Sequence, residues 1–449
     1  MNPTKAPPVR PPARIAAALL WLMIILCSLL LLDNLLAQFF GPSKPKGTDF
    51  LFIAVAGGFL IVAAFAKKAR QKLALAMFAS LLVLLPLEIA LTIASRQARP
   101  FDSFVNPPGL HRVLEPRRIK GASPVAVMTT NSLGLRGPEF SDEDRVRILC
   151  IGGSTTECLY LDDTRTWPAL LGQKLNADKP GVWVGNAGRS GLNCIDHLTL
   201  VRHLPEAWKV DCWLVLCGVN DLNMYRHGTA DDRIRRSYEL TFPYRRPGIS
   251  STLQRPLQRN LYTWHLMEKV FQRIKEKMSD PNRAVAQDRE GEWVEQTLRH
   301  LIATTTTAET KDFTADLQRY RGYLQQIIAE ARTRKITVVF ATQPTSWSAK
   351  PPDDIREHLK ALGADEIFFQ WQANSALALD QFNQVMRDLC KAEGMQCIDV
   401  ARVVPPNTEC FYDDCHFTEQ GAEVVAAHLA GALKEHIATF DRRAAAPAP

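Results

Sequence analysis

The chain has 449 residues, of which 46% are hydrophobic and 22% are charged. This length predicts two or three structural units, and the composition excludes a disordered, collagen-like or disulfide-packed protein. The mean hydropathy of −0.11 is that of a water-soluble chain. A net charge of +7 spread evenly over the chain would suit binding to nucleic acid or to a membrane surface.

The positive charge is concentrated at the N-terminus. Residues 1–95 hold nine Lys and Arg against three Asp and Glu, so they carry six of the seven excess charges. The remainder of the chain is almost neutral. The charge therefore gives no support to nucleic-acid binding, and no nucleic-acid partner is expected.

Three long apolar runs occupy the same segment: Ile15–Leu32, Phe50–Ala66 and Leu73–Ala94. A membrane-spanning helix needs about 17–25 such residues, and each run is long enough. The runs lack a polar stripe of helical period, which argues against buried core helices, and the first is too long for the apolar part of a cleaved signal peptide. We therefore expect three transmembrane helices, at about 15–32, 50–66 and 73–94.

Basic loops predict the orientation of these helices. The N-terminal tail has three basic residues and the loop Lys67–Lys72 has four, whereas the loop with Lys44 and Lys46 has two. Loops rich in Lys and Arg stay in the cytoplasm. Everything after Ala94 is thus expected outside the membrane, which in a bacterial cell is the periplasm or the outer surface.

The remaining chain predicts an α/β domain. Residues 96–145, rich in Pro, Arg and Gly, are expected to form a linker or strap, and 441–449 a disordered tail. Within 146–440, apolar strands alternate with helices at about 312–334 and 419–440, which predicts a three-layer sandwich around a parallel five-stranded sheet of flavodoxin-like type. A polar stretch at about 222–310 is expected to be a helical insertion that sets specificity. The expected strands are Arg147–Gly153, Val182–Asn186, Cys212–Cys217, Ile336–Thr342 and Gln396–Val400.

Polar residues follow the predicted strands at the edge where open α/β sheets bind ligands. Ser154 lies between a strand and a helix start, Gly188 permits close backbone approach, and Asn220 carries an amide suited to an oxyanion. Asp413 precedes His416 by three residues, a spacing that lets a carboxylate orient the imidazole. Each block alone is explained by a turn or a cap, but their order and context together predict an active site.

These four blocks resemble the SGNH (GDSL-like) hydrolase family, which is named after its Ser, Gly, Asn and His. The resemblance covers about 147–221 and 310–435, and three further segments, Thr130–Gly137, Thr342–Pro344 and Phe411–Asp413, look like those of membrane-linked bacterial members. Two positions depart from the family pattern: Gly153 replaces the usual Asp, and no Pro follows His416.

The resemblance implies acyl transfer through an acyl-enzyme. His416 would take the proton of Ser154, and Asp413 would orient His416, with Asp414 as the adjacent competitor for that role. The oxyanion would be held by the N–H groups of Ser154 and Gly188 and by the Asn220 amide.

Other site types fit the sequence less well. There is no G-x-S-x-G elbow, since Gly188–Leu192 misses it by one position, and no G-x-G-x-x-G motif. A zinc site made by Cys410, Asp413, Cys415 and His416 would lack the second pair of ligands, such as H-x₃₋₅-H, that usually accompanies a cysteine pair. No metal and no cofactor are therefore expected.

Nine of the ten cysteines follow Ala94, where an extracytoplasmic location would permit oxidation. Disulfides are predicted between Cys158 and Cys194, next to the Ser154 and Gly188 blocks, and between Cys410 and Cys415 around the Asp413 loop. Cys212 and Cys217 should point to opposite faces of a strand, and Cys150 and Cys217 should be buried thiols.

The leading function is hydrolysis of carboxylic esters, such as acetyl groups on a cell-envelope glycan or lipid. The first alternative is an O-acyltransferase that uses the same triad on an extracytoplasmic polysaccharide. The second is a catalytically silent glycan-binding module. The expected partners are an acylated glycan or lipid and, in the cell, polysaccharide-synthesis machinery.

Overall fold

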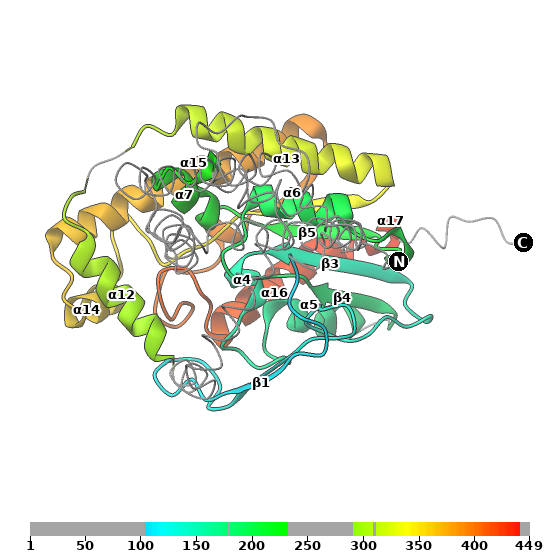
Figure 1. Ribbon diagram of the computed structural model, residues 1–449, viewed down its shortest axis with the longest axis horizontal. Coiled ribbons are helices and arrows are strands. Elements are labelled where there is room, and N and C mark those ends of the chain that lie inside the picture. The colour runs from blue at the N-terminus through cyan, green and yellow to red at the C-terminus, as the bar shows by residue number, and fades with distance from the viewer. Residues whose placement is uncertain (1–103, 178–179, 232–290, 309–310, 441–449) are drawn as a thin grey trace, which may run out of the picture. The chain divides into compact units, whose positions relative to one another are not determined.

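The computed structural model describes residues 104–177, 180–231, 291–308 and 311–440 (Figure 1). The three expected transmembrane helices, most of the expected insertion and the C-terminal tail lie outside the described residues. In the part of the chain that is described, no helix combines the length and apolar character needed to cross a bilayer.

A parallel sheet of five strands forms the centre of the described domain, in the order β4-β3-β5-β6-β7. This is the flavodoxin-like order that the alternation of strands and helices predicts. All four strand pairs are parallel, and the three inner strands are rich in Val, Ile and Leu, which suits burial on both faces. The strands are β3 (Val146–Gly152), β4 (Val182–Asn186), β5 (Cys212–Leu216), β6 (Thr337–Ala341) and β7 (Gln396–Ile398).

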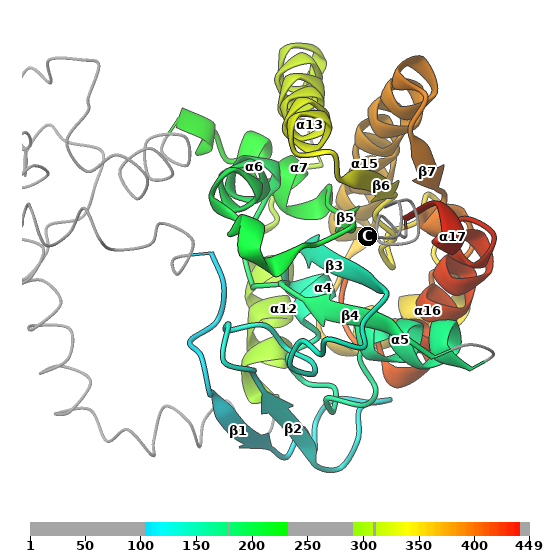
Figure 2. The ribbon, with the colours of Figure 1, turned by 90° about the vertical axis from the view of Figure 1, so that its right-hand side faces the viewer.

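Alternate residues of the strands build two separate cores. Ile148 and Cys150 of β3 pack on one face, and Leu149 and Ile151 pack on the other. The first face is covered by α5 (Trp167–Asn176) and α16 (Glu419–Lys434), which also contact each other. Figure 2 shows these two helices on one side of the sheet, with α6 (Cys194–His203), α13 (Thr314–Arg334) and α15 (Glu366–Glu393) on the other. The predicted three-layer sandwich is confirmed.

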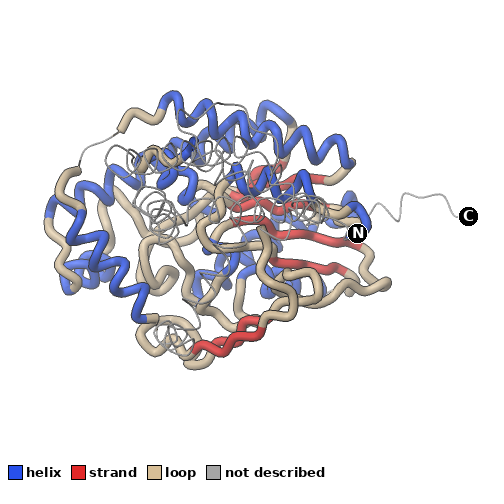
Figure 3. Tube along the Cα trace, viewed as in Figure 1, coloured by secondary structure: helices blue, strands red, loops and turns tan. Residues whose placement is uncertain are grey.

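The strap that precedes the sheet has structure of its own. Strands β1 (His111–Leu114) and β2 (Ala126–Thr129) pair antiparallel, which the sequence did not predict. The short strands and the many loops around them are visible in Figure 3. The described residues also form the helices α4 (Ser154–Glu157), α7 (Val219–Arg226), α12 (Glu292–Thr304), α14 (Asp353–Ala361) and α17 (Ile437–Phe440) and the 3-10 helices η2 (Glu206–Trp208) and η3 (Val400–Arg402).

Local sequence explains where the helices that flank the site begin. Thr166 accepts a hydrogen bond from the Ala169 N–H at the start of α5, where Pro168 fits the first turn. Asn193 and Asp196 form a capping box at the start of α6. These caps fix both helix ends directly behind loops that reach the carboxyl edge of the sheet.

Both predicted disulfides are wrong, because each pairs cysteines from opposite sides of the sheet. Cys158 and Cys410 belong to the core under α5 and α16, whereas Cys194 and Cys415 belong to the core under α6 and α13. All four are free and buried. Burial raises the pKa of each of these thiols, that of Cys158 to about 12.

The other cysteine expectations are confirmed. Cys212 and Cys217 lie on opposite faces of the sheet. Cys150 and Cys217 are buried free thiols.

Candidate active site

Three residues from two distant parts of the chain form a hydrogen-bonded relay at the carboxyl edge of the sheet. The hydroxyl of Ser154 lies 2.7 Å from Nε2 of His416. Nδ1 of His416 lies 2.6 Å from Oδ2 of Asp413. If the imidazole carries its proton on Nδ1, it donates to Asp413 and Nε2 is left to accept the serine proton, which is the arrangement of a nucleophile, a base and an orienting acid.

Asp413 is fixed by its own loop as well as by the imidazole. Its Oδ1 accepts the backbone N–H groups of Cys415 and His416, at 2.9 and 2.8 Å. The ring of Tyr412 stacks on His416 with an interplanar angle of 10°. Asp414, the competitor for the orienting role, makes no hydrogen bond to the imidazole among the described contacts, so the structure brings Asp413 into the relay.

The charged groups of this loop shift one another's pKa values. Burial alone would lower the pKa of His416, but the Asp413 carboxylate overcomes it and raises the pKa to about 9. Burial opposes ionisation of Asp413, yet His416 and the two backbone N–H groups hold the pKa of Asp413 below its ordinary value. Burial and the neighbouring Asp413 raise the pKa of Asp414 to about 6.

Sheet topology brings Ser154 and Asn220 together. Gly152 of β3 is paired with Leu216 of β5, and these strands flank the point where the strand order reverses, which is where such sheets bind ligands. Ser154 opens the short helix α4, so its N–H points out of a helix start. The Asn220 amide donates to the Leu192 carbonyl at 2.8 Å and lies against Gly153, the residue before the nucleophile.

Gly153 is the position where the family pattern has Asp. A Cβ atom there would lie 2.5 Å from Nδ2 of Asn220 and 3.1 Å from the Leu192 carbonyl oxygen. In this chain a larger residue at position 153 would have to displace the Asn220 amide from its present place.

The structure does not offer Gly188 as an oxyanion donor. Its N–H is buried and already donates to Oδ1 of Asn186 at 2.8 Å. A Cβ atom at Gly188 would lie 2.3 Å from the Glu157 nitrogen, so this glycine is needed for close packing on α4. Gly191, with φ of +77°, has an N–H without a partner among the described residues and precedes Leu192, the contact of Asn220. It is the better candidate; sequence reasoning missed it, although the second glycine of the Asn186–Gly191 block was a signal from which it could have been found.

Side chains from other segments hold the single turn of α4. The buried guanidinium of Arg136 donates to the carbonyls of Glu157 and Cys158, at 2.7 Å each, and Nε lies 2.5 Å from Oδ1 of Asp163. Asn186 donates to the Thr156 carbonyl at 2.7 Å. The Thr130–Gly137 segment thus supplies the residue that closes the C-terminus of the nucleophile helix, a role the sequence did not reveal.

Glu157 links α4 to the glycine loop. Its carboxylate accepts from the N–H of Ser190 at 2.8 Å and from the Ser190 hydroxyl, and on its other side from the Asn106 amide at 3.1 Å. The loop that carries Gly191 is therefore tied to the helix that carries Ser154. Sequence reasoning missed this residue because a glutamate in a first helical turn is ordinary at a helix N-terminus.

The Thr342–Pro344 segment packs beneath the site. The side chain of Gln343 contacts Thr155 at 3.3 Å, and its backbone exchanges two hydrogen bonds with the Asn383 amide. The segment thus joins α15 to the turn beside the nucleophile.

Four neighbouring residues offer metal-ligating atoms, all within 4.8 Å of one another: Asp413, Asp414, Cys415 and His416. Two of them use those atoms in the relay, since Nδ1 of His416 faces Oδ2 of Asp413. A metal at this position would have to replace the bond that orients the imidazole.

Comparisons with known proteins were made on the sequence and on the structure. Residues 150–424 match the GDSL-like Lipase/Acylhydrolase family. No curated protein matches the chain.

Solved structures with some similarity include a lipase/acylhydrolase from Enterococcus faecalis, with 15% identity over 65% of this chain and 96% of that one and a TM-score of 0.34. An aryl esterase from M. smegmatis has 14% identity over 65% and 99% of the two chains and a TM-score of 0.33. An acetyl xylan esterase has 12% identity over 64% and 100% and a TM-score of 0.34.

The family match covers more than half of the chain and includes the nucleophile turn, both glycine-containing loops, the Asn220 helix and the loop of Asp413 and His416. The chain belongs to the GDSL-like lipase/acylhydrolase family and is a hydrolase of the esterase type.

Proposed function

We propose that the protein is a serine esterase that removes acyl groups, such as acetyl, from a glycan or lipid of the cell envelope. The observation that carries this proposal is the relay of Ser154, His416 and Asp413, with donor–acceptor distances of 2.7 and 2.6 Å. A silent binding module would have no reason to keep these three side chains in hydrogen-bond contact.

In the proposed mechanism His416 removes the proton of Ser154 as Oγ attacks the ester carbonyl. Asp413 stabilises the imidazolium that forms. The N–H of Ser154, the amide of Asn220 and the N–H of Gly191 stabilise the oxyanion, and one such donor is worth about 3–4 kcal/mol in the transition state. His416 then protonates the leaving alcohol, and water releases the acyl group from Ser154 by the reverse steps.

We further propose that the protein is membrane-anchored through residues 1–95 and that the catalytic domain faces the extracytoplasmic side. The three apolar runs and the basic loops of that segment support this orientation. An anchored hydrolase on that side would meet envelope glycans and lipids as its nearest ester substrates.

The test is release of p-nitrophenol from p-nitrophenyl acetate by the purified full chain. Wild-type turnover with a loss of about 10⁴-fold or more in Ser154→Ala supports the esterase. Equal inactivity of both proteins with retained glycan binding would contradict it. Transfer of the acetyl group to an added oligosaccharide instead of water would assign the protein as an acyltransferase.

A further inference from the structure

A groove of about 1100 Å³ begins beside the relay. At one end it is lined by Asp414, two residues before His416 in sequence. One wall is α7, which carries Asn220 and, on its following turns, Asn223 and Arg226. The groove therefore lies where the part of a substrate beyond the reacting ester would extend.

The wall of the groove mixes hydroxyl and amide groups with apolar side chains. Four consecutive threonines at 304–307 line it together with Asn374 and Gln381, and so do the apolar Leu377 and Ala378. A lipid chain calls for a continuous apolar wall, whereas a glycan presents hydroxyls and apolar ring faces in alternation. The lining favours a polyhydroxylated ligand.

Arg226 is held rigidly in this wall. Its guanidinium donates to the Ser375 hydroxyl at 2.8 Å and lies 4.9 Å from the ring centroid of Trp371. Trp371 is stacked in turn on Phe368, with ring centroids 5.3 Å apart. Because Trp371 packs against both Arg226 and Phe368, it helps to position the guanidinium.

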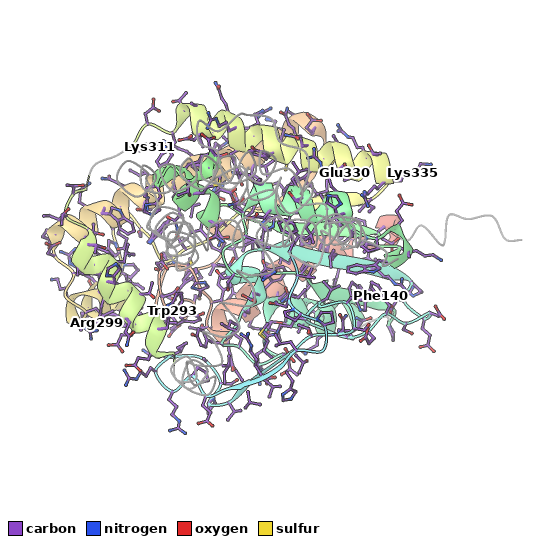
Figure 4. The ribbon with its side chains drawn as sticks, viewed as in Figure 1. Phe140, Trp293, Arg299, Lys311, Glu330 and Lys335 are labelled. Atoms are coloured by element: carbon purple, nitrogen blue, oxygen red, sulfur yellow. The ribbon has the colours of Figure 1, made fainter. Side chains whose placement is uncertain are left out.

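Within the described residues no carboxylate lies within ion-pair distance of the Arg226 guanidinium, although Asp414, which lines the same groove, favours its charged form and raises its pKa against the effect of burial. The guanidinium has five N–H donors, and Ser375 takes one of them. Lys311, labelled in Figure 4 near the start of α13, is by contrast already paired with Asp316 at 2.7 Å. A fixed guanidinium with unused donors matches a carboxylate or phosphate in a bidentate manner.

We propose that this groove binds an anionic glycan and that Arg226 is the subsite for its carboxylate or phosphate group. The inference rests on the proposed function, because this glycan is the part of the ester substrate that does not react. The acylated hydroxyl lies at the end lined by Asp414, two residues before His416, and the charged group lies at Arg226.

The test uses the full chain carrying Ser154→Ala, in a detergent without a sugar headgroup, so that binding is measured without turnover. The ligands are trigalacturonate, its trimethyl ester and a phosphorylated trisaccharide, measured by isothermal titration calorimetry. We expect trigalacturonate or the phosphorylated sugar to bind about 10–100-fold more tightly than the neutral ester, as for a charged hydrogen bond. The anion that binds more tightly shows whether the Arg226 subsite takes a carboxylate or a phosphate.

Adding Arg226→Gln should abolish this preference, and Arg226→Lys should keep part of it. Arg202→Gln is the matched control, since Arg202 lies on α6, donates to Gln326 and does not line the groove. Equal affinity for charged and neutral ligands, or an equal loss of both in Arg226→Gln, would overturn the inference. If the proposed esterase activity is wrong, the p-nitrophenyl acetate assay shows it. If the proposed anion subsite is wrong, the ligand-binding measurements show it.

Discussion

The charge on His416 has opposite effects on catalysis and on stability. Asp413 favours the imidazolium, which lowers the barrier when the proton arrives but also keeps the resting imidazole protonated until the pH approaches about 9. The folded-state pKa lies above the ordinary value of about 6.5. The stabilisation from this pair is therefore fully present below pH of about 6.5 and is lost as the pH rises through about 9.

The pH profile is the prediction at this scale. Because only the neutral imidazole accepts the serine proton, kcat/KM for p-nitrophenyl acetate should rise with pH and level off above about 9. Asp413→Asn should move the midpoint to lower pH and reduce the plateau by about 10⁴-fold. A midpoint that stays in place after this substitution would show that Asp413 does not raise the pKa of His416.

At the scale of elements, α4 is the part of the site that depends most on contacts from other segments. It has four residues, too few to be stable alone, and its C-terminal carbonyls are bonded by Arg136 and Asn186. The position of the nucleophile therefore depends on the strap and on β4 more than on the helix itself.

Arg136→Met should lower the free energy of unfolding by about 3–5 kcal/mol, because it leaves buried carbonyls and Asp163 without their donor. Urea titration of the full chain measures this change in the free energy of unfolding. Arg165→Met is the control, since the Arg165 side chain is 58% exposed and its contact with Glu419 is 3.8 Å long. This control should change stability by no more than about 0.5 kcal/mol. Similar effects of the two substitutions would contradict the capping role.

The sequence predicted those elements whose signal is local. Continuous apolar runs identified the strands, and the three-residue spacing from Asp413 to His416 identified the relay. It could not show that the Gly188 N–H would be taken by Asn186, because that contact depends on how the chain turns after β4. The cysteine pairs failed for a related reason, since position along the chain does not tell on which side of a sheet a loop residue is buried.

At the scale of the whole molecule, the protein divides into a basic, apolar N-terminal segment and a nearly neutral catalytic domain. We predict that the full chain stays in carbonate-washed membranes and that protease added to spheroplasts digests the catalytic domain. Replacing Lys67, Lys68, Arg70 and Lys72 by Gln should reduce this digestion, because it removes the charges that in this proposal keep the loop 67–72 in the cytoplasm. Recovery of the full chain in the carbonate supernatant would contradict the anchor.

The relay joins residues that are 262 positions apart. The ribosome therefore finishes the nucleophile turn and its Arg136 cap long before it makes the base. A nascent chain that stops before Asp413 carries the serine without a proton acceptor, so incomplete chains and early truncation products are inert toward the cell's own esters. Activity is acquired only with the last part of the domain to be synthesised.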